Sequence, residues 1–257
     1  MISFISAFKK FKGVYKNIQH SALYSWRANN IEVIIPTIEV DAKINCSQYS
    51  NARFIDGIKR GRELGFNTQS PVIKDLIDKA LPQINTTMVA FINSDIIILD
   101  NFSEIIEKIF NKYGYNIYLV GSRQDIQLQD RVGSVETYKK LMQEKREEYD
   151  PYTSSDIFIT SKFWWRKIIK DMPEFIMGRY GWDNWFHMYA EKNRLEKYNC
   201  SSVLTLLHCK HGFEHILKQE GAKERLAPSS LHNLRLWRAE QDVYGTTSIK
   251  TWPKIEV

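Results

Sequence analysis

The sequence predicts one α/β domain, on three observations. Short runs of β-branched and aromatic residues alternate along the chain with segments whose apolar residues repeat at helical spacing. Residues 1–257 contain no internal repeat and no linker long enough to separate two domains. The composition is that of a globular protein, 43% hydrophobic and 26% charged, and a chain of this length can bury a sizeable core.

The first hundred residues contain the strands and helices expected of one α/β half. The strands are predicted at residues 2–8 (ISFISAF), 31–37 (IEVIIPT) and 88–92 (MVAFI). The helices are predicted at residues 15–29 and 70–81. In the first helix, Ile18, Ala22 and Trp26 recur at helical spacing. In the second, Ser70 can cap the helix and Pro71 fits its first turn.

The remainder of the chain continues the alternation. Helices are predicted at residues 101–114, 135–149, 162–172, 181–194 and 229–241. Strands are predicted at residues 115–123, 155–160 and 201–208. Gly114 ends the first of these helices, and the helix at 135–149 has a strongly charged face.

Charge and cysteine usage limit the partners and the compartment. The formal net charge of +6 weakly favours phosphorylated or polyanionic partners, but the basic residues are scattered, so no nucleic-acid partner is expected. Cys46, Cys200 and Cys209 form no CxxC pair and are odd in number, which indicates a reducing compartment. The sequence shows neither a signal peptide nor a transmembrane segment, so we expect a cytoplasmic protein.

Two common nucleotide-binding classes are excluded by their missing signatures. The sequence has no GxxxxGK[ST] loop and no GxGxxG turn. A P-loop ATPase and a dinucleotide dehydrogenase are therefore not expected. A bound nucleotide would have its phosphates neutralised in another way.

Asp95 stands between two runs that both belong in a core, MVAFI and IIIL. An ionised Asp is costly to bury unless it is paired or bound to a metal. Asn93 and Asp95 lie two residues apart, so in extended geometry both side chains can point the same way and suit Mg²⁺ or Mn²⁺. The alternatives are that Asp95 caps the helix begun near Asp100, or ends the strand with a turn.

Asp183 lies in the segment GRYGWDNWF, residues 178–186. The two glycines allow the backbone to place Asp183 at the head of a helix, where the dipole favours a carboxylate. Trp182 and Trp185 flank it, an arrangement suited to a sugar ring that stacks while one hydroxyl is deprotonated. The alternative is a helix N-terminus with two core tryptophans and Asp183 as its cap.

Three histidines follow the strand at 201–208, in LLHCKHGFEH. At this density, His208, His211 and His215 indicate a metal ligand or a phosphate contact. Their spacing does not match HExxH, and no carboxylate lies at a familiar offset, so a zinc site of their own is not indicated. Two of the three can equally be surface groups or groups that support the ligands.

Taken in order, these segments resemble a known family. The order is NSD (93–95), VGSRQD (120–125), SSDIFIT (154–160), GRYGWDNW (178–185) and HCKHGFEH (208–215). The sequence is similar to the GT-A-type glycosyltransferases, small nucleotide-sugar-dependent enzymes of bacteria and large DNA viruses. The resemblance implies a GT-A fold, a Rossmann-like mixed sheet flanked by helices. Residues 1–100 would form the nucleotide-binding half and residues 101–257 the acceptor-binding half.

The resemblance also implies a donor site. Asn93, Ser94 and Asp95 would replace the family's DxD metal motif, although Asn93 in place of the first acid lowers the charge of the site. Asp95 would bind Mn²⁺ or Mg²⁺ bridging the diphosphate of a UDP- or GDP-linked sugar. The resemblance leaves His208 and His211 open as the histidine ligand. The residues expected at the nucleoside are Glu39, Asp41 and, less strongly, Ser6.

The chemistry implied is inverting transfer to a hydroxyl of a glycan or other acceptor. The acceptor hydroxyl needs a base within hydrogen-bond reach, and we expect Asp183 to be that base, with Asp156 as the second choice. Arg123 adds positive charge against the leaving diphosphate. Two alternatives stay open: a metal-dependent phosphohydrolase or nuclease, and a non-catalytic module that binds carbohydrate or nucleotide through its aromatic residues.

Overall fold

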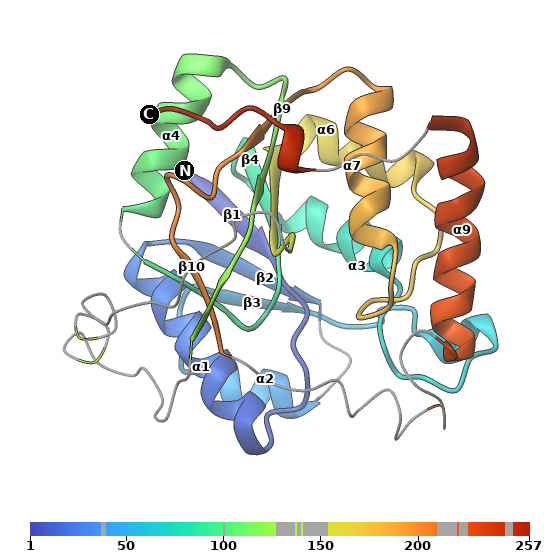
Figure 1. Cartoon of the computed structure of the whole chain (residues 1–257). Helices are drawn as coiled ribbons and strands as arrows, with labels where there is room; N and C mark the ends of the chain where they lie inside the picture. The colour runs from blue at the N-terminus through green and yellow to red at the C-terminus, as the bar shows by residue number, and fades with distance from the viewer. Residues whose placement is uncertain are drawn as a thin grey trace.

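Two β-sheets organise the protein in a computed structural model (Figure 1). The structure describes residues 1–36, 40–99, 101–126, 137, 140, 154–209, 220, 226–244 and 249–257. Within these residues, a seven-stranded sheet has the order β3-β2-β1-β4-β8-β6-β9, and a three-stranded sheet has the order β5-β10-β7. The alternation of strands and helices predicted from the sequence is therefore confirmed at the level of fold class.

The large sheet is mixed, because one inner strand runs against its neighbours. Its strands are β1 (Ile2–Ile5), β2 (Glu32–Pro36), β3 (Ala52–Ile55), β4 (Met88–Ile92), β6 (Ile117–Gly121), β8 (Ile157–Ser161) and β9 (Glu196–Asn199). Strand β8 is antiparallel to both β4 and β6, whereas every other pair in this sheet is parallel. The carboxyl ends of β1, β4 and β6 consequently meet the amino end of β8 at one edge.

The small sheet begins where strands of the large sheet end. It consists of β5 (Ile96–Ile98), β7 (Gln124–Ile126) and β10 (Leu206–Cys209). Strand β5 follows β4 after a turn, and β7 follows β6 after two residues. The central strand β10 is antiparallel to β5 and parallel to β7. The polar residues at the ends of β4 and β6 are therefore held between two sheets.

Helices cover both faces of the large sheet (Figure 1). The α-helices are α1 (Gly13–Ala28), α2 (Val40–Cys46), α3 (Ile73–Ala80), α4 (Phe102–Tyr113), α6 (Lys162–Asp171), α7 (Trp182–Lys192) and α9 (Pro228–Tyr244). Short 3₁₀ helices are η1 (Gly61–Leu64), η2 (Leu81–Gln83) and η4 (Ile249–Thr251). In the described part of the chain, no helix is long and apolar enough to cross a membrane.

Side-chain alternation along the strands divides the core into two layers. In β4, Met88, Ala90 and Ile92 join the layer that also contains residues of α1 and α4. Val89 and Phe91, between them, join the opposite layer with residues of α3, α6 and α7. A strand buried on both faces has to be apolar throughout, which explains the uninterrupted MVAFI run.

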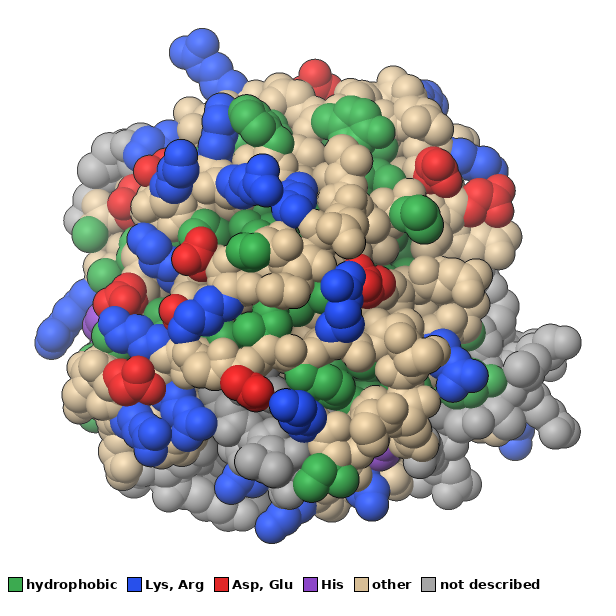
Figure 2. Space-filling view, turned by 180° about the vertical axis from the view of Figure 1, so that it is seen from behind, with side chains coloured by type: hydrophobic (Ala, Val, Ile, Leu, Met, Phe, Trp, Pro, Cys, Tyr) green, Lys and Arg blue, Asp and Glu red, His purple; other side chains and the backbone are tan. Residues whose placement is uncertain are grey.

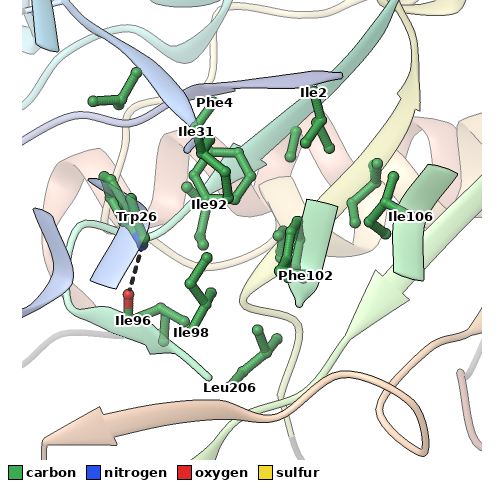
Figure 3. Packing of buried hydrophobic residues seen from close by; sticks show 14 of the residues in the cluster. Ile2, Phe4, Trp26, Ile31, Ile92, Ile96, Ile98, Phe102, Ile106 and Leu206 are labelled. Carbon is green, nitrogen blue, oxygen red and sulfur yellow. Dashed lines mark hydrogen bonds between the residues drawn. The ribbon is translucent and has the colours of Figure 1, made fainter. Parts of the chain in front are cut away.

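Trp26 joins α1 to the segment that follows Asp95 (Figure 3). Its side chain is fully buried, and its indole N–H donates to the carbonyl of Ile96 over 3.0 Å. The ring also makes an edge contact with Phe4, at 5.4 Å between centroids. One residue earlier, the hydroxyl of Ser25 accepts from the backbone N–H of Ile98. Helix α1 therefore fixes β5 through both side-chain packing and hydrogen bonds.

The predicted elements differ from the observed ones mainly at their ends. Helix α3 begins at Ile73, not at Ser70, because the carbonyl of Ser70 accepts from Gly61 and its N–H donates to Thr68. The predicted strand at 201–208 is a strand only from Leu206, and the chain turns before it. The helix predicted at 135–149 lies outside the described residues, apart from positions 137 and 140.

Among the strands and α-helices of the described residues, five had no expectation from the sequence: α2, β3, β5, β7 and β9. Strands β3 and β9 are the two edges of the large sheet. An edge strand is partly exposed, and Ala52–Ile55 and Glu196–Asn199 accordingly contain polar residues and lack a continuous apolar run. Their assignment depends on the neighbouring strand, which a local pattern does not reveal.

Positive charge is not collected into one patch on the face seen from behind. Figure 2 shows Lys and Arg side chains interspersed with Asp and Glu over that face. Elsewhere among the described residues, opposite charges also pair: Lys59 with Glu174 at 2.7 Å and Lys79 with Asp75 at 3.0 Å. On this face, the scattered basic pattern predicted from the sequence is observed.

Replacing Trp26 by Phe should destabilise the fold more than the same change at Trp164. The Trp26→Phe variant loses the hydrogen bond to Ile96 and leaves a cavity in the core, so the free energy of unfolding should fall by about 2–4 kcal/mol. The indole of Trp164 also donates a hydrogen bond, to Asn116, but at the exposed surface. Trp164→Phe should cost less than about 1 kcal/mol in urea unfolding; equal losses would contradict the anchoring role of Trp26.

Candidate active site

Three strand ends of the large sheet meet at the candidate site. Asn93 follows β4, Arg123 follows β6, and Asp156 precedes β8. The backbone N–H of Asn93 donates to the carbonyl of Asp156 over 3.1 Å, and that of Asp156 donates to Gly121 over 3.0 Å. The backbone ladder therefore holds the three side chains at one edge of the sheet.

Asp156 is the carboxylate of this group and is almost completely buried, with 1% of its surface exposed. Its Oδ1 accepts from Arg123 Nη1 at 2.8 Å and from Asn93 Nδ2 at 3.1 Å. Its Oδ2 is buried and has no hydrogen-bond partner among the described residues. One oxygen thus fixes the side chain, and the other is left to accept a donor from a ligand or water.

The second sheet contributes Asp95, Asp125 and His208. Oδ1 of Asp125 accepts from Arg123 Nε at 3.2 Å and lies 2.8 Å from His208 Nδ1. On the far side of the imidazole, His208 Nε2 lies 3.8 Å from Asp95 Oδ2. A continuous series of polar contacts therefore runs from Asp156 through Arg123 to Asp125, and on to the imidazole that faces Asp95.

The turn between β4 and β5 changes the expected relation of Asn93 to Asp95. Residues 94 and 95 form a turn, not an extended strand. Asn93 bonds to Asp156, whereas Asp95 faces His208, so the two side chains have different partners. The helix-cap alternative for Asp95 is wrong, since the first N–H of α4, at Phe102, donates to Asn29. The turn alternative is correct for the backbone.

Protonation states follow from burial and from these contacts. Burial by itself lowers the pKa of Arg123, but the neighbouring carboxylates Asp156 and Asp125 outweigh it and raise that pKa. Burial tends to raise the pKa of Asp125, yet the hydrogen bond from His208 and the charge of Arg123 bring it below its ordinary value. Burial is the main reason why the pKa of His208 is lowered. A neutral imidazole between charged partners is the result.

Asp95 and His208 fit a divalent cation by separation and by chemistry. Ligands about 2.1 Å from one Mg²⁺ or Mn²⁺ are about 3.0–4.2 Å apart, a range that includes their 3.8 Å. Among the described residues, no three His, Cys, Asp or Glu side chains group closely enough to hold a metal. Such ions often take only one or two protein ligands when substrate phosphates complete the shell. His211 and His215 lie outside the described residues.

Asp183 stands in the first turn of α7, as predicted. The preceding Gly181 has a φ of 99°, a left-handed conformation that favours glycine. Asp183 Oδ1 accepts from the N–H of Asn184 at 2.9 Å. Burial raises the pKa of Asp183, and the charge of Asp156 raises it further, although backbone N–H groups oppose both effects. The influence of Asp156 indicates that the two carboxylates lie within electrostatic range of each other.

Arg179 fixes the loop that leads to Asp183. Its guanidinium is fully buried and pairs with Glu220, at 2.7 Å from Nη2 to Oε1. The same guanidinium donates to the hydroxyl of Thr68 over 3.0 Å. Thr68 lies between η1 and α3, far from Arg179 in the sequence. This loop is therefore tied to two distant parts of the chain.

Trp182 and Trp185 lie in the core. They are 7% and 3% exposed, and both belong to the layer that contains Phe91 and Phe158. The ring of Trp182 makes an edge contact with Phe91 at 5.7 Å, and that of Trp185 packs on Tyr189 at 5.1 Å. This packing favours the core alternative, and the sugar-stacking role has no support from it.

The other predicted donor residues fall in three situations. Ser6 follows β1, is fully buried, and its hydroxyl has no hydrogen-bond partner among the described residues. Ser94 is also buried, but its hydroxyl donates to Gln19 at 3.3 Å and so helps to hold the turn. Glu39 lies outside the described residues, and Asp41 lies in α2 with a side chain that is likewise not described.

Sequence reasoning assigned no role to Lys9, Gln19 or Asp125. The Gln19 side chain accepts from the backbone N–H of Lys9 at 2.7 Å and donates to its carbonyl at 3.0 Å. Burial lowers the pKa of Lys9, and its charge is within range of Asp95, which opposes that shift. Lys9 could have been noticed because it comes directly after the first predicted strand, at residues 2–8. Asp125 could have been noticed because it ends the VGSRQD segment that already supplied Arg123.

The sequence also did not predict a set of buried, hydrogen-bonded polar side chains around His187, on the same helix as Asp183. His187, one turn further along α7, has its Nε2 at 2.9 Å from Ser155 Oγ and its Nδ1 at 3.5 Å from the hydroxyl of Tyr118. Burial lowers the pKa of His187 to about 3, so the ring is neutral. His187 follows Asp183 by four residues, and on a helix this spacing places two side chains on the same face, which could have pointed to His187.

Comparison with solved structures identifies the fold. Over 93% of this chain, the structure is similar to S. aureus TarS 1–349 in complex with UDP-GlcNAc, with 17% identity and a TM-score of 0.58. The complex of TarS 1–349 with UDP matches with 14% identity and a TM-score of 0.52, over 93% of this chain and 70% of that one. The chain spans 66% of the length of the first of these structures. The predicted GT-A fold class is confirmed.

The sequence comparisons add nothing to this likeness. No protein-family model matches the sequence. No curated protein matches it either. The fold is accordingly established by structural similarity alone.

The buried carboxylate of Asp183 should make stability depend on pH. Its pKa is raised in the folded protein above the ordinary 3.8, so its contribution to stability is fully present below pH 3.8 and is lost as the pH rises through the folded pKa. Asp183→Asn removes this loss, because the amide is neutral throughout. The melting temperature of the variant relative to wild type should therefore increase from pH 4 towards pH 8.

The control for this experiment is Asp78→Asn, which removes one exposed carboxylate on α3. Thermal unfolding of the three proteins is followed across the same pH series. A difference between Asp183→Asn and wild type that stays constant with pH would show that the Asp183 carboxylate is not desolvated by folding.

Proposed function

We propose that this protein is a glycosyltransferase that moves a sugar from a UDP- or GDP-linked donor to a hydroxyl of a glycan or another acceptor. The observation that carries the proposal is the meeting of carboxylates, an arginine and a histidine at the edge of a GT-A-type sheet. Ligands of open α/β sheets bind beyond the carboxyl ends of the strands, which is where these side chains lie. The likeness in fold to a protein solved with UDP-GlcNAc supports the same choice.

The donor diphosphate is assigned to the junction of the two sheets. Asp95 and His208 would hold Mn²⁺ or Mg²⁺ there, with His211 the other histidine candidate. A cation in this place would supply positive charge against the leaving diphosphate. Arg123 adds a cation held by Asp156, and the ammonium of Lys9 is within electrostatic range of Asp95. The proposed nucleoside contacts are Ser6, Glu39 and Asp41.

The transferred sugar is assigned to the space between Asp156 and Asp183. Oδ2 of Asp156 is a buried acceptor without a hydrogen bond among the described residues, so a sugar hydroxyl is a suitable donor to it. A hydroxyl bound there is fixed in direction, because Arg123 and Asn93 immobilise the other oxygen of the same carboxylate. Asp156 remains the second choice for the catalytic base.

Asp183 is the proposed base. It accepts the proton of the acceptor hydroxyl while the acceptor oxygen forms a bond to the anomeric carbon and the bond from that carbon to the phosphate oxygen breaks. The electron pair of the broken bond leaves with the nucleoside diphosphate. Because the acceptor attacks in line, from the face opposite the leaving group, the anomeric centre is inverted. The raised pKa of Asp183 makes this carboxylate a stronger base than an exposed aspartate.

Donor binding should require both Asp95 and a divalent cation. A ligand that binds only the folded state raises the melting temperature. Nucleotide sugars and free nucleotides of each base are added with and without Mn²⁺, and one nucleotide class should raise the melting temperature of the wild type only with the metal. The Asp95→Ala variant should lose this shift, and Asp78→Ala, an exposed carboxylate, should keep it.

A shift that needs neither the metal nor Asp95 would contradict the donor assignment and favour a binding module. Rapid cleavage of a plain phosphodiester without any nucleotide-sugar shift would instead favour a phosphohydrolase. The same titration therefore separates the proposed function from both alternatives.

Asp183→Asn should separate binding from transfer. The variant should keep the donor-induced melting shift, while its transfer rate falls by roughly 10²–10⁴-fold because the acceptor hydroxyl loses its base. Transfer is measured as release of nucleoside diphosphate in the presence of acceptor, with Asp78→Asn as the matched control. Transfer at the wild-type rate in Asp183→Asn would move the base assignment to Asp156.

A further inference from the structure

Asp125 occupies a place in the site that the sequence did not assign. It lies in the middle of β7, and the parallel register of β7 with β10 sets it directly beside His208. Its contacts with His208 and Arg123 use the same atom: Oδ1 is 2.8 Å from His208 Nδ1 and 3.2 Å from Arg123 Nε. The backbone pairing of two strands, not a flexible loop, therefore determines the distance between the carboxylate and the imidazole.

This contact determines which nitrogen of His208 carries the proton. An ionised carboxylate can only accept hydrogen bonds, so a neutral imidazole at this distance has its hydrogen on Nδ1. The Nε2 lone pair then faces Asp95, whose Oδ2 is 3.8 Å away. Arg123 donates to the same oxygen of Asp125 and so keeps the carboxylate oriented towards the ring.

The other side of His208 is fixed as well. The antiparallel register of β10 with β5 pairs His208 with Ile96, the residue directly after Asp95. His208 is 5% exposed, so solvent does not compete freely for its ring. One carboxylate therefore lies on each side of this imidazole: Asp125, in β7, on the Nδ1 side, and Asp95, in the turn before β5, on the Nε2 side.

We infer that Asp125 is a positioning residue that holds His208 in the Nδ1–H tautomer, with the Nε2 lone pair directed at a divalent cation shared with Asp95. The inference rests on the metal-assisted donor site of the proposed function. Carboxylates that accept from the second nitrogen of a histidine ligand typically improve metal affinity about 10–100-fold. Asp125 would touch neither substrate nor metal and would act through His208 alone.

The test measures the tautomer and the metal affinity separately. Long-range ¹H–¹⁵N correlation spectra of the metal-free protein at pH 7.5 distinguish Nδ1–H from Nε2–H imidazoles, and the His208→Asn variant identifies the His208 signals among the six histidines. Binding of Mn²⁺ alone is measured from the spin resonance of the free ion. The variants are Asp125→Ala and Asp125→Asn, and Asp171→Ala removes a carboxylate that accepts from Tyr189 away from the site.

Wild type should show the Nδ1–H tautomer, and Asp125→Ala should lose it and bind Mn²⁺ about 10–100-fold more weakly. Asp125→Asn should recover most of the Nδ1–H population, because its amide oxygen can accept from the ring while Arg123 orients it. Asp171→Ala should behave as wild type. An Nε2–H tautomer in wild type, or an unchanged tautomer in both Asp125 variants, would overturn the inference.

Failure of the proposed function gives a different result. If wild type takes up no Mn²⁺, the metal-assisted donor site is wrong, whatever the tautomer. The positioning role of Asp125 is then decided by the tautomer spectra alone: loss of Nδ1–H in Asp125→Ala supports it, and retention overturns it. If Asp125→Ala does not fold, Asp125→Val decides the same question, because it suits a strand but cannot accept a hydrogen bond: loss of Nδ1–H supports the role, and retention overturns it.

Discussion

The turn between β4 and β5 is the constraint on which the site depends. At this turn the chain leaves the large sheet and enters the small one, and both flanking strands are fully buried. A shift of either strand by one residue would expose its apolar side chains, so the register leaves little freedom to Asp95. Trp26 holds the exit of the turn through the carbonyl of Ile96, and Gln19 accepts from Ser94 within it. A carboxylate placed in this way lies at a position determined by the core.

Charge balance at the site follows from the same arrangement. Asp156 is almost completely buried, which would be costly for an isolated carboxylate. Arg123 pairs with it and also with Asp125, so one guanidinium compensates two carboxylates. Buried ion pairs of this kind add little net stability, because desolvation offsets most of their attraction. Their effect here is positional: each charged group fixes the direction of the next.

The GRYGWDNW segment combines a structural role with the candidate base. Its two tryptophans pack in the core layer beneath the sheet, and Arg179 ties the preceding loop to Glu220 and Thr68. Asp183 therefore lies at the head of a helix whose inner face is fixed by aromatic packing. The aromatic residues support the carboxylate from below, and its desolvation is the reason that its pKa is raised.

The sequence by itself determined the fold class and most central elements, and it singled out several of the residues that the structure brings together at the candidate site. The apolar run MVAFI and the helix that ends at Gly114 carry local signals that tertiary structure did not override. The order of NSD, SSDIF and GWDNW was enough to single out Asp95, Asp156 and Asp183. The division into a nucleotide-binding half, 1–100, and an acceptor-binding half, 101–257, stays a prediction, although the site draws on both.

Only the tertiary structure decided which of these residues touch one another. The edge strands β3 and β9 depend on neighbours distant in sequence, and so they had no local pattern. The partners of Asp125 are set by the pairing of β7 with β10, about eighty positions apart. The burial of Trp182 and Trp185 likewise depends on strands that precede them by many residues. Side-chain chemistry can be read locally, but contact is decided by strand register and by packing across the sheet.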